Sequence, residues 1–332
     1  MIPHPNFRQL LKIAVLLAVA TQSQAEPVLS LIFDDPNGQA ATVRDTEISS
    51  GTGGVARLQS EASDWEDSEE PPKTFQIITD SAMGTNAFLR LINDKEIPGS
   101  RGVVITPNGV EASLGAITQQ AGGKLTFNGG VDMFFRYNEE IPSQQELVPN
   151  LLSIGGGGLR FIVEAEAGTV IATVVDEKED KIFDTDFDGV ADATRVTTLF
   201  VKGAPIDPET PYHLAIAFET ADSGVVTVKV FMKAGTGPID TKQDEDMVSQ
   251  MSFTALTEDP EKVLHGGSFS IGAISRTSPA KVILDLAAFR IFTPAPAVFP
   301  DVSVPESSVP EGTEGAEGSG TEGSGTDKAG TE

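Results

Sequence analysis

The chain has no cysteine, one tryptophan and two tyrosines among its 332 residues. Without cysteine, an exported fold of this sequence has no disulfides and depends on core burial or a bound metal ion. The scarcity of large polar aromatics counts against a deep carbohydrate cleft lined by stacking rings. Positive charge is also short, because 23 Lys and Arg residues face 49 Asp and Glu residues, giving a net charge of −26. So acidic a surface repels phosphate groups, which argues against nucleic acid and anionic membranes as partners.

Long apolar runs are missing except near the N-terminus. There, Arg8 and Lys12 precede the apolar stretch Ile13 to Ala20, and small residues at Ser23 and Ala25 follow. This pattern predicts a secretory signal peptide over residues 1–25, cleaved after Ala25. The alternative, an uncleaved anchor, needs about 20 apolar residues, more than this stretch supplies. We expect a protein that is secreted, periplasmic or on the cell surface, without membrane insertion.

Cleavage would remove two positive charges and no negative ones, which takes the net charge from −26 to −28. The C-terminal residues 297–332 form a second distinct segment, rich in Gly, Ser and Glu and without an aromatic after Phe299. Low hydrophobicity combined with negative charge predicts a disordered acidic tail. Its simplest role is a solvated terminus or linker; the alternative is a spacer or an ion-attracting tail.

Between these segments, residues 26–296 show short strand patterns separated by turn residues, and almost no helical periodicity. Such spacing predicts one all-β domain, an antiparallel sandwich of two sheets. The expected strands are 28–33, 74–79, 88–91, 102–106, 124–128, 131–137, 151–154, 159–165, 169–175, 197–201, 212–218, 225–232, 268–274 and 282–292.

The most telling pair of strands is 211–218 and 224–231, which are joined by a polar connection. In the second strand, Val226, Val228 and Val230 alternate with Thr227, Lys229 and Phe231. This period of two is typical of a half-buried strand.

The sequence of these two strands resembles that of laminin-G-like (concanavalin A-like) jelly rolls, in which a Tyr-His-Leu-Ala strand precedes a Val-x-Val-x-Val partner. The first strand ends in Phe33-Asp34 and the last reads Leu284-Asp285 followed by Arg290-Ile291-Phe292, similar to the opening and closing strands of that family. The strand 131–137 is similar to its middle strand. The resemblance implies a jelly roll whose first and last strands pair, and a glycan as the default ligand.

The sharpest chemical motif is the segment 184–192, Asp-Thr-Asp-Phe-Asp-Gly-Val-Ala-Asp. Carboxylates at alternate positions, followed by a glycine that permits a turn, can fold hard oxygen ligands around one ion. The expected ion is Ca²⁺, which accepts many oxygens in an irregular loop. The expected ligands are Asp184, Asp186, Asp188, the carbonyl of Val190 and Asp192.

This loop is not an EF-hand, because loop position twelve is Arg195 rather than the bidentate Glu that an EF-hand needs. It is similar instead to the Asp-rich loops of thrombospondin type 3 repeats and dockerins. The alternative interpretation is an acidic surface loop without a metal.

Catalytic patterns are weak. The pairs in Glu164-Ala165-Glu166 and in the acidic run 176–180 do not match the order that jelly-roll glycosidases use along one strand. We expect His213 to be a packed or hydrogen-bonded core residue rather than a base. The single tryptophan, Trp65, lies in an acidic segment and is either a platform for a sugar ring or a residue tucked against the sandwich edge.

These observations favour a secreted, non-enzymatic binding or adhesion module with a structural calcium site. Its expected partner is a glycan or another extracellular or cell-surface ligand. Two alternatives stay open: a polysaccharide-active enzyme (glycoside hydrolase or lyase) on the same fold, and a structural envelope or matrix protein.

Overall fold

The structure, a computed structural model, describes residues 26–33, 50–52, 54–60, 75–93, 101–107, 118–121, 124–138, 150–156, 159–166, 169–176, 181–200, 206–257, 269–273 and 282–302. The chain divides into the units Met1–Val302 and Ser303–Glu332, and every described residue lies in the first. The expected signal peptide, Trp65 and residues 303–332 of the expected tail therefore lie outside the described residues.

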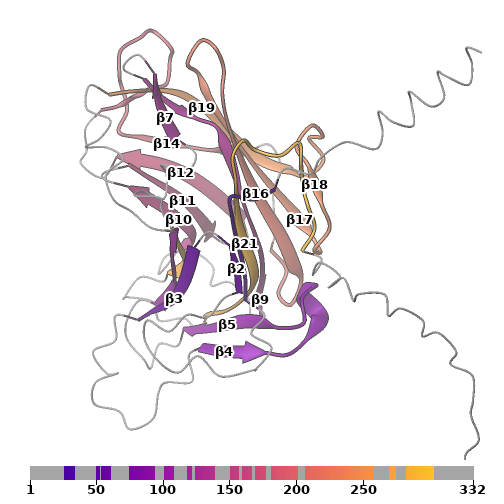
Figure 1. Ribbon diagram of the computed structural model, residues 1–332. Coiled ribbons are helices and arrows are strands. Elements are labelled where there is room, and N and C mark those ends of the chain that lie inside the picture. The colour runs from indigo at the N-terminus through magenta and orange to yellow at the C-terminus, as the bar shows by residue number, and fades with distance from the viewer. Residues whose placement is uncertain are drawn as a thin grey trace, which may run out of the picture. The chain divides into compact units, whose positions relative to one another are not determined.

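The larger sheet is antiparallel and runs in the order β2–β1–β21–β9–β16–β17–β19–β8–β7 (Figure 1). Along that path the strands are β2 (Ser50–Thr52), β1 (Leu29–Ile32), β21 (Val282–Phe292), β9 (Gly129–Tyr137), β16 (Pro211–Thr220), β17 (Val226–Ala234), β19 (Met247–Leu256), β8 (Lys124–Phe127) and β7 (Thr118–Ala121). Four more strands join it: β13 (Phe183–Asp184) and β15 (Leu199–Phe200) pair with β19, β5 (Phe88–Asn93) pairs with β21, and β4 (Phe75–Ile78) pairs with β5.

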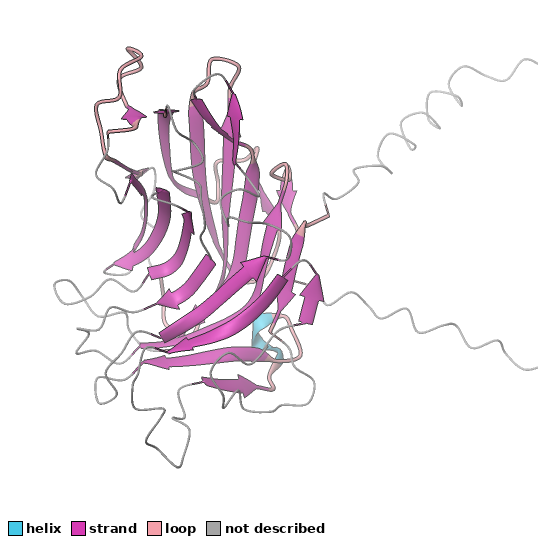
Figure 2. Cartoon of the chain, turned by 60° about the vertical axis from the view of Figure 1, so that its left-hand side comes forward, coloured by secondary structure: helices cyan, strands magenta, loops and turns pink. Residues whose placement is uncertain are grey.

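The second sheet is also antiparallel and runs in the order β14–β12–β11–β10–β20–β6–β3. Its strands are β14 (Arg195–Thr197), β12 (Thr169–Asp176), β11 (Leu159–Glu166), β10 (Asn150–Gly156), β20 (Phe269–Ala273), β6 (Arg101–Pro107) and β3 (Gly54–Ser60). Figure 2 shows its strands facing the longer strands of the larger sheet, as the two layers of a sandwich.

The main core lies between the two sheets, and the alternation of side chains along each strand builds it. On β9, Val131, Met133 and Phe135 point into this core and pack with residues of the second sheet such as Leu152 and Phe161. Removing such apolar surface from water contributes roughly 25 cal/mol per Å². Burial of this kind is the main source of stability that we expect in a chain without cysteine.

The other face of the larger sheet, here called the outer face, is covered by the chain itself. Two smaller apolar clusters lie there. The first contains Met83, Phe88, Phe134, Ala287, Ala288 and Val302, and the second contains Ala215, Phe231, Ile239, Met247, Phe292 and Phe299. The cover is made by the short 3-10 helix η2 (Ser81–Met83, cyan in Figure 2) and by a small sheet of β18 (Ile239–Asp240) and β22 (Val298–Phe299).

The structure confirms the expected all-β, antiparallel two-sheet sandwich. The first strand, β1, pairs with β21, the last of the strands expected from the sequence, as the jelly-roll resemblance implied, with Leu29 opposite Ile291 and Ile32 opposite Ala288. The strand β19 was not expected, although it is central to the larger sheet. The folded unit also extends past residue 296, the expected end of the domain, because Phe299 and Val302 are buried. None of the helices in the described residues is long and apolar enough to cross a membrane.

Candidate functional site

The Asp-rich loop connects the two sheets at the rim of the sandwich. It leaves the larger sheet at β13, which pairs with β19, and enters the second sheet at β14, which pairs with β12. At its base, Phe183 and Ala193 form an isolated bridge with N···O distances of 3.1 and 2.9 Å. The ring of Phe183 is buried and packs edge-on against Phe253, with the centroids 5.2 Å apart. The base of the loop is therefore anchored in the core.

Within the loop, the first three aspartates accept hydrogen bonds from backbone N–H groups that follow them. Asp184 is almost fully buried, and its two oxygens accept from the N–H groups of Phe187 at 2.7 Å and Gly189 at 3.0 Å. Asp186 accepts from the N–H of Asp188 at 3.3 Å, and Asp188 accepts from that of Val190 at 2.8 Å. These local bonds bend the chain so tightly that Phe187 and Gly189 adopt positive φ angles of 63° and 91°.

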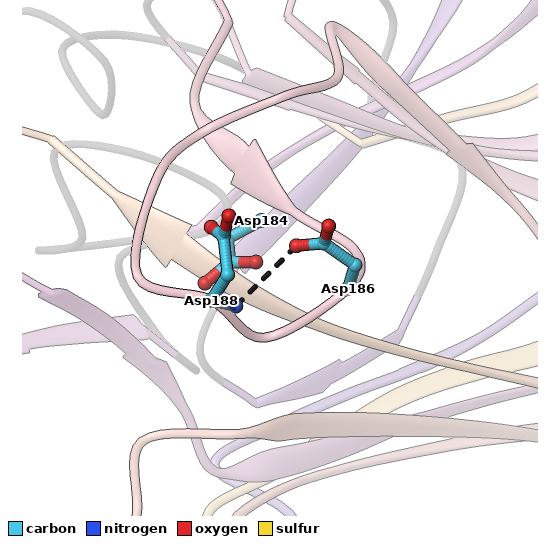
Figure 3. A group of neighbouring side chains, drawn as sticks. All are labelled: Asp184, Asp186 and Asp188. Carbon is cyan, nitrogen blue, oxygen red and sulfur yellow. Dashed lines mark hydrogen bonds between the residues drawn. The ribbon is translucent and has the colours of Figure 1, made fainter.

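The bending brings three carboxylates together. One oxygen each from Asp184, Asp186 and Asp188 lies within 4.8 Å of the others, and Figure 3 shows the three side chains converging above the turn. Each carboxylate oxygen has a second lone pair beyond the one that accepts a backbone N–H. Three hard oxygen donors in an irregular loop fit Ca²⁺ better than Mg²⁺, which demands a near-ideal octahedron.

One of the five expected ligands, Asp192, has a hydrogen-bond partner of its own. Asp192 is turned toward Thr185, whose N–H reaches Oδ1 at 3.1 Å and whose hydroxyl donates to Oδ2 at 2.8 Å. That hydroxyl bond is the main reason that the pKa of the Asp192 carboxyl lies below its usual value. Val190 is exposed and donates its own N–H to Asp188. The structure thus gathers three aspartates and gives Asp192 a different partner.

Two exposed apolar side chains flank the cluster. Phe187 is 49% exposed and Val190 is 64% exposed, although large apolar residues elsewhere in the described part of the chain are mostly buried. The exposure of these two side chains was not predicted from the sequence, which assigned a role only to the carbonyl of Val190. A usable signal was present, since a phenylalanine between alternating aspartates of a turn has no strand face on which to be buried. Trp65, the expected platform, lies outside the described residues.

His213 is a buried, hydrogen-bonded residue, as expected. Its Nδ1 lies 2.8 Å from the carbonyl oxygen of Gly237 and its Nε2 lies 3.1 Å from Oδ2 of Asp132. The burial of Asp132 and of a second carboxylate, Asp285, was not predicted from the sequence. Both side chains are completely buried on the outer face and both are paired with arginine.

No family model and no curated protein matches this chain. Its fold is similar to that of the receptor-binding domain of botulinum neurotoxin type G, with 12% identity, a TM-score of 0.44, and coverage of 82% of this chain and 49% of that one. The binding domain of serotype C1 gives 9% identity and a TM-score of 0.43, covering 81% of this chain and 48% of that one. The serotype D binding domain gives 11% identity and a TM-score of 0.41, with the same coverage. This chain spans about half the length of those structures, and similarity this low carries no inference about function.

Proposed function

We propose that this chain is an exported, non-enzymatic binding module of the laminin-G-like (concanavalin A-like) type. Its signal peptide is residues 1–25, and its ligand is a glycan on an extracellular or cell-surface partner. The proposal includes a structural Ca²⁺ ion held by Asp184, Asp186 and Asp188. The observation that carries it is the convergence of these three carboxylates within 4.8 Å in a loop that links the two sheets at the rim.

Calcium has a structural role in this proposal. The three carboxylates repel one another, and the whole chain is already strongly acidic. A divalent cation would neutralise the cluster and fix the segment that joins the two sheets. Asp192 would join the ion only by giving up its two bonds to Thr185, so we assign it a secondary place.

The glycan contact is assigned to the surface around the loop. Phe187 offers a half-exposed ring on which a sugar ring can stack, and Val190 extends the apolar contact. Polar groups that a calcium ion orders beside this ring would then fix the orientation of the sugar. Trp65 remains a second candidate platform from the sequence.

The non-enzymatic part of the proposal is supported by the way the two fully buried carboxylates are used. Asp132 accepts from Arg290 and Asp285 accepts from Arg90 and Arg136, so both are committed to ion pairs inside the fold. A glycosidase of this fold needs a pair of carboxyl groups that face the substrate. Because of these ion pairs, neither Asp132 nor Asp285 is free to act as one of such a pair.

A glycan array, probed with the full chain at fixed ionic strength, tests the proposal. Binding should require calcium and should be lost in Asp186→Asn and reduced in Phe187→Ala. Asp222→Asn is the matched control, because it removes one exposed carboxylate from the turn between β16 and β17. Binding that is indifferent to calcium and to Phe187 would overturn the site. Release of reducing ends from laminarin, agar, carrageenan or alginate would overturn the non-enzymatic assignment.

A further inference from the structure

Two segments that are distant in sequence cover the same part of the outer face. We call residues 235–246, which contain β18, the cover loop, and residues 294–302, which contain β22, the strap. They are joined to each other by the β18–β22 pair and by two bonds from Thr241, whose N–H and hydroxyl both donate to the carbonyl oxygen of Ala297 at 3.0 Å. The cover loop and the strap therefore form one layer.

The strap is seated on the sheet by an aromatic ring. Phe299 is completely buried and packs edge-on against Phe292, with the ring centroids 5.4 Å apart. It approaches β9 so closely that a Cβ on Gly130 would lie 2.7 Å from the Phe299 ring. Gly130 is thus a position where any side chain would push the strap away from the sheet.

Arg290 ties the strap to a buried carboxylate. Its Nε donates to Oδ1 of Asp132 at 2.9 Å, and its Nη2 donates to Oδ2 at 2.6 Å. The same guanidinium donates to two carbonyl oxygens of the strap, from Nη2 to Pro300 and from Nη1 to Asp301. Arg290 therefore holds Asp132 and the strap at the same time.

His213 ties the cover loop to the same carboxylate. A carbonyl oxygen and a carboxylate only accept hydrogen bonds, so the ring is the donor in both of its contacts, from Nδ1 to Gly237 and from Nε2 to Asp132. On its other side the ring meets Oδ2 of Asp132, and it stacks on Phe134 with the centroids 4.1 Å apart. Among the described residues, Asp132 is thus the point at which the anchors of both covering segments meet.

We propose that Asp132 locks a detachable cover: through Arg290 and His213 it fastens the strap and the cover loop to the outer face, and the two segments open together. The hydrogen bonds form a closed circuit from Asp132 to Arg290, the strap, the cover loop, His213 and back. Loss of the negative charge leaves the Arg290 cation buried without its partner. The Arg290 cation is then more stable in water than in its buried position. As the guanidinium turns outward, its hydrogen bonds to the strap break.

Opening would expose an apolar surface. Beneath Phe299 lie Ala215, Phe231 and Phe292, which are all buried in the closed form. The cover itself has few backbone bonds to the rest of the fold, since β18 and β22 pair only with each other among the described strands. It should therefore open locally, without unfolding of the long strands beneath it.

A closely matched control lies on the same face of the same sheet. Asp285 is equally buried and accepts from Arg90, Arg136 and Asn138, all of which are side chains from neighbouring strands or their ends. Its arginines have no bond to the strap or the cover loop among the described residues. Asp285→Asn therefore removes the same charge as Asp132→Asn without cutting the lock.

Hydrogen exchange in the full chain tests the lock, read at the Thr241 N–H and at the amides of β18 and β22. In Asp132→Asn the exchange rate of these amides should rise at least about tenfold, because hydrogen bonds to charged groups are lost. Amides of the β16–β17 hairpin should be slower than those of the cover in the parent protein, and Asp285→Asn should not speed the cover selectively. An unchanged cover in Asp132→Asn, or equal opening in both variants, would overturn the proposal.

Two milder variants keep the proposal testable if Asp132→Asn fails to fold. Arg290→Lys keeps the positive charge but loses the paired N–H groups with which the guanidinium donates to both oxygens of Asp132. His213→Asn keeps a donor near the Gly237 carbonyl but loses the contact with Asp132. Each should speed exchange in both the strap and the cover loop, and the double variant should fall short of the product of the two effects, since both act through one carboxylate. If each variant opened only its own segment, the coupling through Asp132 would be excluded.

Discussion

Asp184 and Asp285 are both almost completely buried, yet their carboxylates are satisfied in different ways. Asp184 accepts from the backbone N–H groups of Phe187 and Gly189, within its own loop. Asp285 accepts from Arg90 and Arg136, which come from β5 and β9 on either side of its own strand. Among the described residues, the first carboxylate has no cationic partner to compensate its charge and lies beside two other aspartates, whereas the second is neutralised by arginine.

These two carboxylates therefore have different roles in the same acidic protein. Backbone N–H groups hold a carboxylate in place without cancelling its charge, which leaves the loop able to attract a cation. Arginine cancels the charge and ties strands together, which leaves nothing for a cation but makes the carboxylate costly to lose. Asp285 in turn raises the pKa of Arg90, chiefly through their hydrogen bond.

The largest expected effect comes from the removal of the carboxylate that arginine neutralises. Asp285→Ala should lower the free energy of unfolding by about 3–5 kcal/mol, because it leaves the Arg136 cation buried without a partner. Chemical denaturation at neutral pH measures this. Asp186→Ala, which removes an exposed carboxylate from the loop, should change the free energy of unfolding in calcium-free buffer by no more than about 0.5 kcal/mol. Similar losses in the two variants would erase the distinction.

The pairing of arginines with buried carboxylates could not be predicted from the sequence. The strands β9 and β21 were both expected, and they pair so that Asp132 lies opposite Arg290 and Arg136 lies opposite Asp285. In sequence the two charges are four residues apart on β9 but five apart on β21, which would place the β21 pair on opposite faces. A register shift between Leu286 and Ala288 restores the match, and alternation alone does not predict such a bulge.

Other differences have similar local causes. A second register shift, between Val230 and Phe231, accompanies the unexpected strand β19. The strap contains prolines at 294, 296 and 300, and its composition merges with that of the following acidic segment, so only the tertiary contacts of Phe299 and Val302 assign it to the fold. In the loop, the spacing predicted the convergence of three aspartates, but the competing hydroxyl of Thr185 decided the position of Asp192.

The strap provides the second test, because it depends on the neutralised carboxylate Asp132. Deletion of residues 297–332 should cost at least about 3 kcal/mol of unfolding free energy, since it removes the burial of Phe299 and Val302. Deletion of residues 303–332 alone should leave the unfolding midpoint nearly unchanged, as expected for a disordered tail. Thermal denaturation of the two truncated chains compares them. Equal midpoints would show that the strap adds no stability.

The third test concerns the three converging aspartates of the loop. If Asp184, Asp186 and Asp188 bind Ca²⁺ in the native state alone, calcium should stabilise the protein by about 2.7 kcal/mol when its free concentration is 100 times the dissociation constant. Chelation should reverse the gain, and Asp186→Ala should abolish the calcium response while the protein stays folded. Asp285→Asn should retain that response if it folds, because its carboxylate is outside the loop.

Ionic strength must be held constant in this experiment, since salt alone screens the repulsion between so many acids. A midpoint that is independent of calcium at matched ionic strength would reduce the loop to an acidic turn. A response that survives in Asp186→Ala would place the ion elsewhere.

The smallest expected effect belongs to Asp192, which local bonds hold as they hold Asp184. The Thr185 hydroxyl is the main cause of its lowered pKa. Because the folded-state pKa lies below the unfolded value of about 3.9, the resulting stability is present above about pH 4 and is lost as the pH falls through the folded-state pKa. Thr185→Val removes the hydroxyl bond, so the carboxyl should titrate nearer its ordinary value and the acid-side loss of stability should become shallower. An NMR titration of the Asp192 carboxyl measures the pKa directly, and an unshifted value in the parent protein would contradict the role of Thr185.

The same variant shows which way Asp192 faces in the calcium-bound form. Tighter calcium binding in Thr185→Val would mean that Asp192 leaves Thr185 to join the ion, whereas unchanged binding would limit the site to the three converging aspartates.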